Sequence, residues 1–305
     1  MSASASDPLL STLRPRLVRL AYRMLGSVAD AEDVVQDAWL RWLASDRDAI
    51  REPAALLRTI VTRLCLNELK SARRRRETYI GPWLPEPVID SEDDDSVDDI
   101  TLPLMITLEL LSPLERAAFL LHDVFGMSFD DVAAVIRREP AACRKLAGRA
   151  REHIRAAKPR FSVTKEDGMA IAAAFFAASR NGDMDRLRLL LAENVTAYTD
   201  GGGKVPASLE PLEGIAAVMA RHVQLAHDFV RSPSLLIRYA LIDGLVGFIS
   251  LEGGGILQTT SLQVQQGRIV AVYITRNPEK LRHLKVVSMP GIAEGNRLRW
   301  PDQSP

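Results

Sequence analysis

The stretch AYRMLGSVADAEDVVQDAWLRW, residues 21–42, predicts a helix that carries one apolar face and one acidic face. The apolar positions recur at helical spacing: Val34, Val35, Ala38, Trp39 and Trp42. Asp30, Asp33 and Asp37 fall together on another side. Leu13, Leu17, Leu20 and Met24 repeat with the same period just before this stretch, so two helices are expected to pack through their apolar faces. The acidic face is then free for a partner, or it is an ordinary solvated surface.

The boundary between these two helices has chemical causes in the sequence. Gly26 suits the end of the first helix, because glycine readily adopts the left-handed conformation of a helix C-terminus. Ser27 suits the start of the second, with Asp30 three residues later as in a capping box.

Composition describes a globular chain with segregated charge. Its 305 residues are 47% hydrophobic and 26% charged, which is enough for two or three packed domains. The balance of 39 basic and 39 acidic residues conceals a basic run at 73–76 and an acidic run between Asp90 and Asp99. Local charge is therefore more informative than net charge.

Neither a membrane segment nor a metal site is expected. The N-terminus MSASASDPLL lacks a basic segment followed by an apolar core, and the apolar run Met169–Ala178 is too short to cross a bilayer. We therefore expect a cytoplasmic protein without membrane contact. Cys65 and Cys143 fall on apolar helical faces, which favours buried reduced thiols over a disulfide or a metal site. No cofactor is expected.

Four segments and a tail follow from the pattern along the chain. Residues 1–77 are predicted to be helical, with a last helix that begins near Pro53. Residues 78–103 contain prolines and many carboxylates, as an extended linker between two folded units would. Residues 104–160 are again helical. Residues 165–285 open with a predicted helix at Met169–Leu191 and continue as strands, and residues 286–305 form a polar tail.

The strands of the last domain are bounded by turn signals. Turns at Asp243–Gly244, at residues 253–255 and at Gln266–Gly267 separate the β-rich runs. Those runs are Leu235–Leu241, Leu245–Leu251, Ile256–Val264 and Arg268–Thr275. This part is therefore expected to be an α+β domain.

The second helical block predicts a helix-turn-helix. Ser112 and Glu115 suit a capping box around Pro113, Ser128 begins a short helix that ends at Ile136, and Pro140 opens a third helix. The inner face of that third helix is apolar: Cys143, Leu146, Ala147, Ala150 and Ile154. Its outer face is cationic and would contact phosphates and base edges: Arg144, Lys145, Arg149, Arg151 and Arg155. Protein-binding helical bundles share this pattern, so DNA is the favoured partner but has a rival.

The last helix of the first block shows a second polar ridge. Arg63, Asn67, Lys70 and Arg74 lie one turn apart on one side, which suits nucleic acid, although such a ridge is also typical of a solvated face. The linker of about 25 residues reaches on the order of 80 Å when extended. One turn of duplex is ~34 Å, so the two basic helices could bind separated elements of DNA.

Residues Leu9–Arg160 resemble an extracytoplasmic function, or group IV, sigma factor of bacterial RNA polymerase. AYRMLGSVADAEDVVQDAWLRW is similar to sigma region 2, a helical bundle, and LSPLERAAFLLHDVFGMSFDDVAAVI is similar to region 4, a helix-turn-helix. The resemblance implies core RNA polymerase, through its β′ clamp helices and its β subunit, and promoter DNA as partners.

The resemblance also implies roles for individual residues. The β′ clamp helices would be bound by Asp30, Glu32, Asp33, Val34, Gln36 and Asp37. The opened −10 element would be bound by the loop Asp46–Glu52 and then by Arg63, Asn67, Lys70 and Arg74. The −35 element would be bound by Ala141, Arg144, Lys145 and Arg149. Trp39 and Trp42 are interpreted as core residues because they fall on the apolar stripe.

Three further motifs resemble those of sigma factors that carry a fused SnoaL-like C-terminal domain. The first is Trp83, Leu84, Pro85, Glu86 and Pro87; the second is Asp200, Gly201, Gly202, Gly203 and Lys204; the third is Asn277, Pro278, Glu279, Lys280 and Leu281. Lys204 and Glu279 stand where the family more often has arginine and aspartate, and both keep the charge. The implied fold is a cone-shaped bent sheet crossed by helices, as in ketosteroid isomerase and nuclear transport factor relatives.

This subgroup resemblance implies regulation within one chain, which is expected to be monomeric when free. The domain would dock on the linker and the sigma blocks, with Trp83 and Leu84 as the peptide that it holds. Asn277 and Lys280 would hold acidic or backbone groups of the linker. A plain turn between strands is the simpler interpretation of residues 200–203, since their glycines allow positive φ.

Two other classes of function stay open. One is a DNA-binding transcriptional regulator whose C-terminal domain senses a small molecule; it would use the helix from Pro140 but would not need the first block. The other is an isomerase-like or hydrolase-like enzyme. Its polar candidates are His222, His227, Tyr239, Asp243, Gln258, Gln263 and Tyr273. The sequence shows no evident pairing of a base with an oxyanion partner among them.

Overall fold

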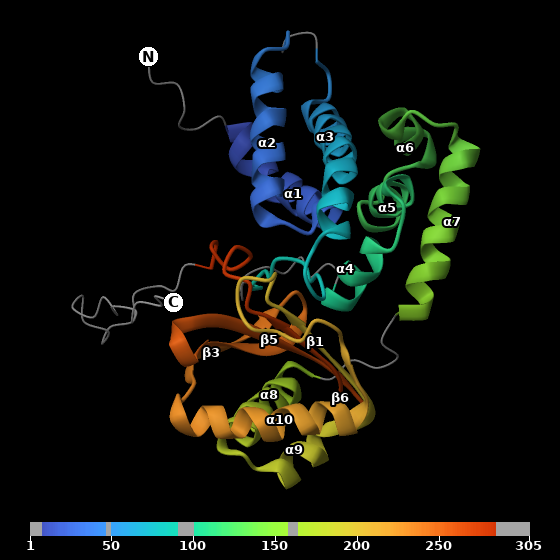
Figure 1. Cartoon of the computed structure of the whole chain (residues 1–305). Coiled ribbons are helices and arrows are strands. Elements are labelled where there is room, and N and C mark those ends of the chain that lie inside the picture. Colours follow the sequence, from blue (N-terminus) through green and yellow to red (C-terminus); the bar gives the residue numbers. More distant parts are fainter. Residues whose placement is uncertain (1–7, 47–49, 91–100, 158–163, 285–305) are drawn as a thin grey trace, which may run out of the picture.

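The computed structural model of the chain describes residues 8–46, 50–90, 101–157 and 164–284. Side chains are described for these residues except 8–10, 70–77 and 156–157. Figure 1 shows two helical blocks above a mixed α/β domain, with residues 78–90 between them. No helix within the described ranges is both long and apolar enough to cross a membrane. Cys65 and Cys143 are buried free thiols, as expected.

The first helical block contains α1 (Pro8–Leu25), α2 (Val28–Leu43) and α3 (Pro53–Glu77). Gly26 has a φ of 71° and ends α1, and the Ser27 side chain accepts a hydrogen bond from the Asp30 amide at 3.2 Å. Both predicted boundary residues therefore act as expected. Trp42 is buried in the core, while Trp39 packs against it partly buried, so both belong to the apolar side of α2.

The second helical block contains the predicted helix-turn-helix. Its elements are α4 (Leu102–Glu109), α5 (Pro113–Phe119), a π-helical turn (Leu120–Val124), α6 (Phe129–Ile136) and α7 (Pro140–Ala157). Ser112 and Glu115 form the expected capping box, and Ser128 caps α6 by accepting from the Asp131 amide at 3.1 Å. Arg137 then turns the chain with a φ of 55°, which ends α6 at the predicted residue.

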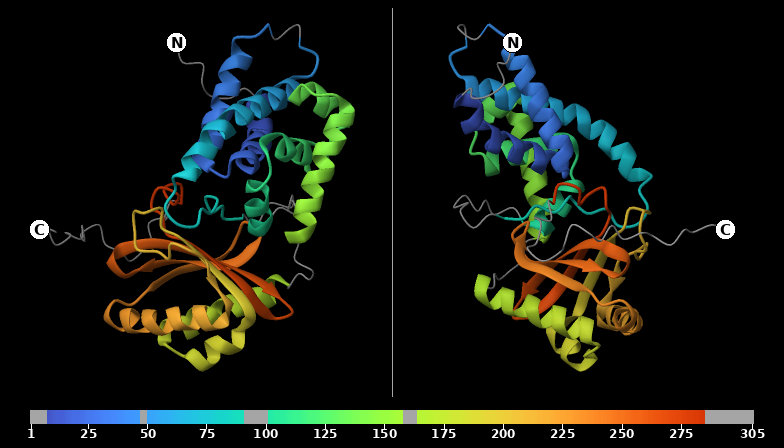
Figure 2. Two further views of the ribbon diagram at one scale, coloured as in Figure 1. Left: turned by 45° about the vertical axis from the view of Figure 1, so that its right-hand side comes forward. Right: turned by 90° about the vertical axis from the view of Figure 1, so that its left-hand side faces the viewer.

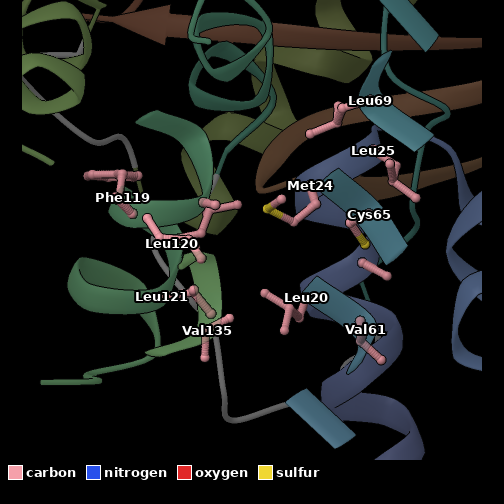
Figure 3. Close-up of a cluster of buried hydrophobic side chains, with 14 of the residues drawn as sticks. Leu20, Met24, Leu25, Val61, Cys65, Leu69, Phe119, Leu120, Leu121 and Val135 are labelled. Carbon is pink, nitrogen blue, oxygen red and sulfur yellow. The ribbon is translucent and has the colours of Figure 1, made fainter. Parts of the chain in front are cut away.

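The two helical blocks share one hydrophobic core, and this differs from the expectation of separate units joined by an extended linker. Leu20, Met24 and Val61 of the first block belong to the same buried cluster as Leu120, Leu121 and Val135 of the second (Figure 3). Long-range packing of this kind is not encoded in the local composition of the linker. α3 contacts α5 and α6, and α1 contacts the π-helical turn, so these two helices also cover the helix-turn-helix.

Arg116 joins the two blocks through hydrogen bonds inside that core. Its guanidinium donates to the Met24 carbonyl at 2.7 Å and to the Leu108 carbonyl at 2.8 Å, and it pairs with Glu109 at 2.9 Å. The side chain is only 2% exposed. Burial lowers the pKa of Arg116 to about 9, and these oxygens compensate for the lost water. The first block is therefore fastened to the second at the C-terminal end of α1.

The α+β domain is built on a single mixed sheet within the described residues. The sheet has the order β2-β1-β6-β5-β4-β3; β1 pairs with β6 in parallel and all other neighbours are antiparallel. The strands are β1 (Leu191–Asp200), β2 (Leu212–Glu213), β3 (Leu235–Ile242), β4 (Leu245–Glu252), β5 (Ile256–Gln265) and β6 (Arg268–Thr275). The helices are α8 (Lys165–Asn181), α9 (Met184–Leu190) and α10 (Gly214–Arg231). The domain is therefore α+β, as expected, with a single bent sheet and helices along one of its faces.

The four predicted strands lie within one residue of their expected ends, but the predicted helix Met169–Leu191 was wrong in two respects. Gly182, with a φ of 71°, ends α8, and Asp183 then caps the separate helix α9. Strand β1 follows α9 directly at Leu191. Residues 184–200 contain no glycine or proline, so the sequence has no local signal for the change from helix to strand at Leu191.

The two faces of the sheet have different neighbours. Helices α8, α9 and α10 cover the face that points away from the helical blocks (Figures 1 and 2). Successive side chains of β6 point to opposite faces of the sheet. Val272 packs into the core that the helices cover, whereas Ala271 and Tyr273 pack with Leu84 of the linker on the other face. The face toward the helical blocks is therefore the one that meets the linker.

Candidate functional site

The acidic face of α2 is exposed where the sequence predicts a partner surface. Glu32, Asp33, Gln36 and Asp37 are exposed, and Asp30 is half-buried beside the Ser27 cap. Glu32 pairs with Arg14 at 3.2 Å, with both side chains about half exposed. Val34 differs, since it is only 9% exposed and lies in the shared core. Its side chain therefore supports α2 from inside and is not on the acidic surface.

The outer face of α7 presents the expected cations. Ala141, Arg144, Lys145 and Arg149 are all exposed. The Arg144 guanidinium lies 5.8 Å from the centre of the Phe129 ring, and Arg149 is 4.0 Å from Glu115 with its side chain 68% exposed. Arg151 is different, because its Nε and Nη2 atoms donate to the two carboxylate oxygens of Asp123, at 2.7 and 3.1 Å. Arg144, Lys145 and Arg149 therefore form the accessible cationic surface.

The polar ridge of α3 faces the second block. Arg63 donates to the carbonyls of Val135 at 3.0 Å and of Ala134 at 2.9 Å, both near the end of α6. Asn67 is exposed at the rim of the same groove between α3 and the helix-turn-helix. The side chains of Lys70 and Arg74 lie outside the described set. In this arrangement Arg63 is engaged by protein oxygens and is turned toward α6.

The linker is held by an ionic cluster from the α+β domain. The Asp200 carboxylate, at the end of β1, accepts from the Leu84 amide at 2.9 Å and from the Tyr79 hydroxyl. Lys280 pairs with the same carboxylate at 2.7 Å and also donates to the Leu84 carbonyl. Asn277 donates to the Tyr79 hydroxyl at 2.8 Å. The three sequence motifs thus meet at one place, as Figures 1 and 2 show for their segments.

Apolar contacts complete this hold on the linker. Leu84 is 1% exposed and packs with Leu245 and Tyr273 of the sheet. Trp83 lies with its ring centre 4.1 Å from the Lys280 ammonium, a cation–π contact, and its far edge lies against Gly26. A Cβ at Gly26 would come within 2.7 Å of that ring. Trp83 therefore fills the space between the first helical block and the α+β domain.

Glu86 connects the linker to the first helical block at the start of α2. Its carboxylate accepts from the Val28 amide at 2.7 Å, and its own amide donates to the Gly26 carbonyl at 2.9 Å. A carboxylate at a helix N-terminus is favourable because the amide groups there are unpaired and the helix dipole is positive. Pro85 and Pro87 on either side are buried. The peptide thus contacts the helix that carries the acidic surface.

Asp243 provides a second anchor, one that the sequence did not reveal. It lies in the β3–β4 turn with a φ of 48°, and its carboxylate accepts from the Tyr22 hydroxyl at 2.8 Å and from the Val88 amide at 3.2 Å. Its backbone pairs with Val88 and Leu102, and Ile89 forms a bridge with Ile242. Burial raises the pKa of Asp243 to about 7, and Asp90 adds to the rise while the two hydrogen bonds oppose it. In the sequence, Asp243 was recognisable only as part of an Asp-Gly turn, and a turn motif does not predict a contact with a residue as distant in the chain as Tyr22.

The remaining motif residues shape the cluster. Gly202 and Gly203 have φ values of 59° and 69°, so the turn interpretation is correct for them. A side chain at Gly202 would collide with Asn277, and one at Gly203 would approach Ile80 to 2.8 Å. Gly201, Pro278 and Leu281 lie in the same two loops, with Leu281 buried. Lys204 and Glu279 pair at 3.5 Å on the surface, with both side chains about half exposed.

The polar candidates for catalysis are not brought together by the fold. Asp243 is engaged by the linker, His227 is exposed on α10, and Tyr239 lies on β3. Tyr273 donates to Gln263 at 3.0 Å and stacks on Tyr198. Only His222 and Gln258 line the same cavity, beside Arg180, Glu252 and Arg276, none of which the sequence had suggested. Those three come from α8, from the end of β4 and from the residue after β6, so no local pattern links them.

Family models match both helical blocks. Residues 9–75 match the model described as Sigma-70 region 2, and residues 103–154 match the model described as Sigma-70, region 4. The residues of the acidic helix fall in the first match, and α7 falls largely in the second.

Relatives extend the similarity over nearly the whole chain. The ECF RNA polymerase sigma factor SigJ of Mycobacterium tuberculosis is 36% identical over 285 residues, which cover 88% of this chain and 90% of the relative. The probable ECF RNA polymerase sigma factor SigI of the same species is 30% identical, covering 92% and 98%. The crystal structure of M. tuberculosis SigJ superposes with a TM-score of 0.73 at 32% identity, covering 90% of this chain and 98% of that one.

Proposed function

The chain belongs to the extracytoplasmic function sigma factors of bacterial RNA polymerase, and we propose that its SnoaL-like domain restrains the two sigma blocks by clamping the linker between them. As a sigma factor it binds the polymerase and directs promoter-specific transcription initiation. The polymerase acts in the cytoplasm, where we also place this chain.

The acidic surface of α2 would recruit the polymerase. Asp33 and Asp37 are exposed on the side of α2 opposite its buried apolar stripe, so a partner can reach them without opening the core. Their charge favours a basic partner surface and speeds encounter with it. The β′ clamp helices and, through other parts of the chain, the β subunit are the partners that we assign. Val34 would act only by keeping α2 in place.

The promoter would be bound by α7 and α3. Arg144, Lys145 and Arg149 on α7 suit phosphate and base contacts in the −35 element, with Ala141 near the start of the helix. Arg63 and Asn67 on α3, followed by Lys70 and Arg74, suit the opened −10 element. Arg63 Nε and Nη2 are engaged by the carbonyls of Val135 and Ala134, so only part of its guanidinium can reach DNA in this arrangement. We propose that α3 and α6 separate when the −10 element binds, which frees the whole side chain.

One observation carries the regulatory proposal: the Asp200 carboxylate holds the Leu84 amide while Lys280 holds the Leu84 carbonyl. Both backbone groups of one linker residue are thus satisfied by a single ion pair of the α+β domain. While this hold persists, the linker cannot extend, and the helical blocks remain packed on each other. The domain acts at the high effective concentration of a tethered partner, around millimolar for a flexible connection, so modest contacts suffice.

Reconstituted transcription tests this function. Core polymerase, genomic DNA fragments and the full-length chain would be combined, and the 5′ ends of the transcripts mapped. We expect defined start sites with the chain and none without it. Lys280→Met should raise the yield of those transcripts, because the clamp is weakened, whereas Lys204→Met alters an exposed pair of the same motifs and should not. Binding to duplex DNA without initiation would favour a repressor, and equal yields from both variants would contradict the clamp.

A further inference from the structure

A cavity of about 290 Å³ lies inside the SnoaL-like domain, away from the linker clamp. Its walls come from α8, α10 and the strands β1, β5 and β6, on the side of the sheet that the helices cover (Figure 2). Its volume lies at the lower end of the range for small-molecule sites, about 300–1,000 Å³. A water occupies ~30 Å³ of liquid, so the cavity suits a molecule of about ten non-hydrogen atoms.

Most of the cavity lining is apolar. The side chains that give it this character are Phe175, Val218, Leu225, Phe229, Val272 and Ile274. These residues suit the body of an aromatic or branched aliphatic compound, since burial of its apolar surface would drive binding.

One region of the lining is cationic. Arg180, Arg221 and Arg276 all line the cavity, and Glu252 and Asp228 are the carboxylates among the lining residues. Glu252 is committed to Arg180 at 2.6 Å and to Ser234, and Asp228 is exposed. Burial lowers the pKa of Arg276; Glu252 opposes this shift, and Arg221 and Arg180 add to it. Three guanidinium groups thus line one cavity. Among the residues that the structure describes, only the Arg180 guanidinium is paired with a buried carboxylate, so an anion would be attracted there.

Two buried polar atoms in this region lack hydrogen-bond partners. Within the described parts of the chain, His222 Nδ1 and Arg276 Nε are buried and make no hydrogen bond. His222 is 7% exposed and its ring meets the Phe175 ring edge-on, with centroids 5.6 Å apart. Burial, together with Arg180 and Arg221, lowers the pKa of His222 to about 4, so the ring is neutral near pH 7. A buried polar atom without a hydrogen-bond partner is destabilising, so both positions favour an occupant that supplies the missing partner.

We propose that this cavity binds a small organic monoanion, a carboxylate with an apolar body of aromatic or branched aliphatic type. The carboxylate accepts from Arg276 and from His222, which uses the tautomer protonated at Nδ1. The body lies among Phe175, Leu225 and Phe229. The site goes beyond the regulatory function proposed above and holds independently of it.

The cavity also shares a wall with the clamp. Ala207 and Ser208 line it, and linker residue Gly81 lies against Ser208 so that a Cβ there would be 3.6 Å from the Ser208 carbonyl. Arg276 and Asn277 both donate their backbone amides to the Asp200 carbonyl, at 2.9 and 3.0 Å. An occupant held by Arg276 would therefore act on the segment that holds Asp200. This coupling, unlike the site itself, rests on the proposed clamp.

Ligand-observed NMR on the full-length chain tests the site with phenylacetate and its neutral isostere phenylacetamide as probes. We expect phenylacetate to bind at least about tenfold more tightly than the amide, which corresponds to ~1.4 kcal/mol. Arg276→Met should remove that preference, and Arg238→Met, which neutralises an exposed arginine of β3, should preserve it. Equal binding of acid and amide, or an Arg276→Met variant that behaves as wild type, overturns the site. So does a dissociation constant weaker than about 10 mM for phenylacetate.

Two further measurements keep the test decisive. Circular dichroism checks that Arg276→Met is folded, and if it is not, His222→Phe replaces it, with a lower phenylacetate affinity expected and an unchanged affinity contradictory. Hydrogen exchange of the amides of residues 78–90 with and without phenylacetate tests the coupling. Bound probe that leaves those rates unchanged overturns the coupling but not the site, and Lys280→Met, which loses the clamp, should still bind the probe.

Discussion

The Lys280 ammonium lies 2.7 Å from the Asp200 carboxylate, with the two side chains 9% and 0% exposed. This pair joins the end of β1 to the loop after β6, and both residues bind the backbone of Leu84. A buried pair of this kind is expensive to break by removing one partner, because the other charge then stays buried alone. The position of the linker therefore depends on both residues together.

Replacing Lys280 with Met should destabilise the docked state of the linker. The loss of one partner from a buried pair costs about 3–5 kcal/mol, against about 0–1 kcal/mol for an exposed pair. Urea unfolding of the full chain measures the difference, and Lys204→Met is the matched control because its pair with Glu279 is half exposed. Equal shifts for the two variants would contradict a structural role for the Asp200–Lys280 pair.

Reversing the charges of Asp33 and Asp37 to Lys should abolish binding to core polymerase. Both carboxylates are exposed and contribute nothing to the core, so the fold should be unaffected. Affinity for polymerase would be measured by fluorescence anisotropy of labelled chain. Asp185→Lys with Glu193→Lys makes the same change in net charge on the SnoaL-like domain. This control should leave the affinity for polymerase within about twofold of wild type, because salt screens exposed charges that lie far from the interface. Equal affinity of the Asp33 and Asp37 variant and wild type would remove the recruitment surface.

Replacing Arg144 and Lys145 with Ala should weaken promoter binding and reduce its dependence on salt. Each phosphate contact contributes about 0.9 to the slope of log affinity against log salt, so two contacts would remove up to about 1.8. The holoenzyme and a promoter fragment from the transcript mapping serve for the titration. Arg186→Ala with Arg188→Ala, on α9, is the control. An unaltered slope with weaker binding would mean that the pair contacts bases, and unaltered binding would exclude both residues from the interface.

Asp243 should give the chain a pH-dependent stability. Its pKa is raised from an ordinary value near 4 to about 7 in the folded chain, chiefly by burial, so folding favours its protonated form. Between these values the folded chain retains a proton that the unfolded chain has released. The free energy of unfolding should therefore fall as pH rises from about 4 to about 7, by up to ~1.4 kcal/mol per pH unit, and level off above.

The pH dependence can be isolated by difference. Urea unfolding of wild type and Asp243→Asn would be compared at each pH, so that the contributions of carboxylates distant from Asp243 cancel. Asp185→Asn is the control, because that carboxylate is exposed. A difference between wild type and Asp243→Asn that stays constant from pH 4 to pH 7 would show that Asp243 does not titrate in this window.

Much of the fold could be predicted because its signals are local. Ser27, Ser112 and Ser128 cap the helices that follow them, and Asp243–Gly244 and Gln266–Gly267 supply the positive φ values of the hairpin turns. The acidic and basic faces of α2 and α7 also follow from periodicity. Strand β1 was missed because α9 passes into it at Leu191 without a breaking residue.

The relations between segments could not be predicted from local pattern. The linker has the composition of an extended chain, yet Leu84 is buried and Glu86 binds the start of α2. Arg63 has the spacing of a nucleic-acid ridge, but whether it faces solvent depends on the carbonyls of α6, far along the chain. The cavity has the same origin, since Arg180, His222 and Arg276 meet only after the sheet has formed.

The distance between the two sigma blocks, in the free chain and in the promoter complex, shows whether the clamp keeps the blocks together. Labels at Leu43 and Glu152 would report it, because both positions are exposed and the native thiols of Cys65 and Cys143 are buried. We expect one short distance in the free chain, a longer one in the complex with polymerase and promoter, and a mixture in free Lys280→Met. A distance that does not change between the free chain and an actively initiating complex would contradict the clamp.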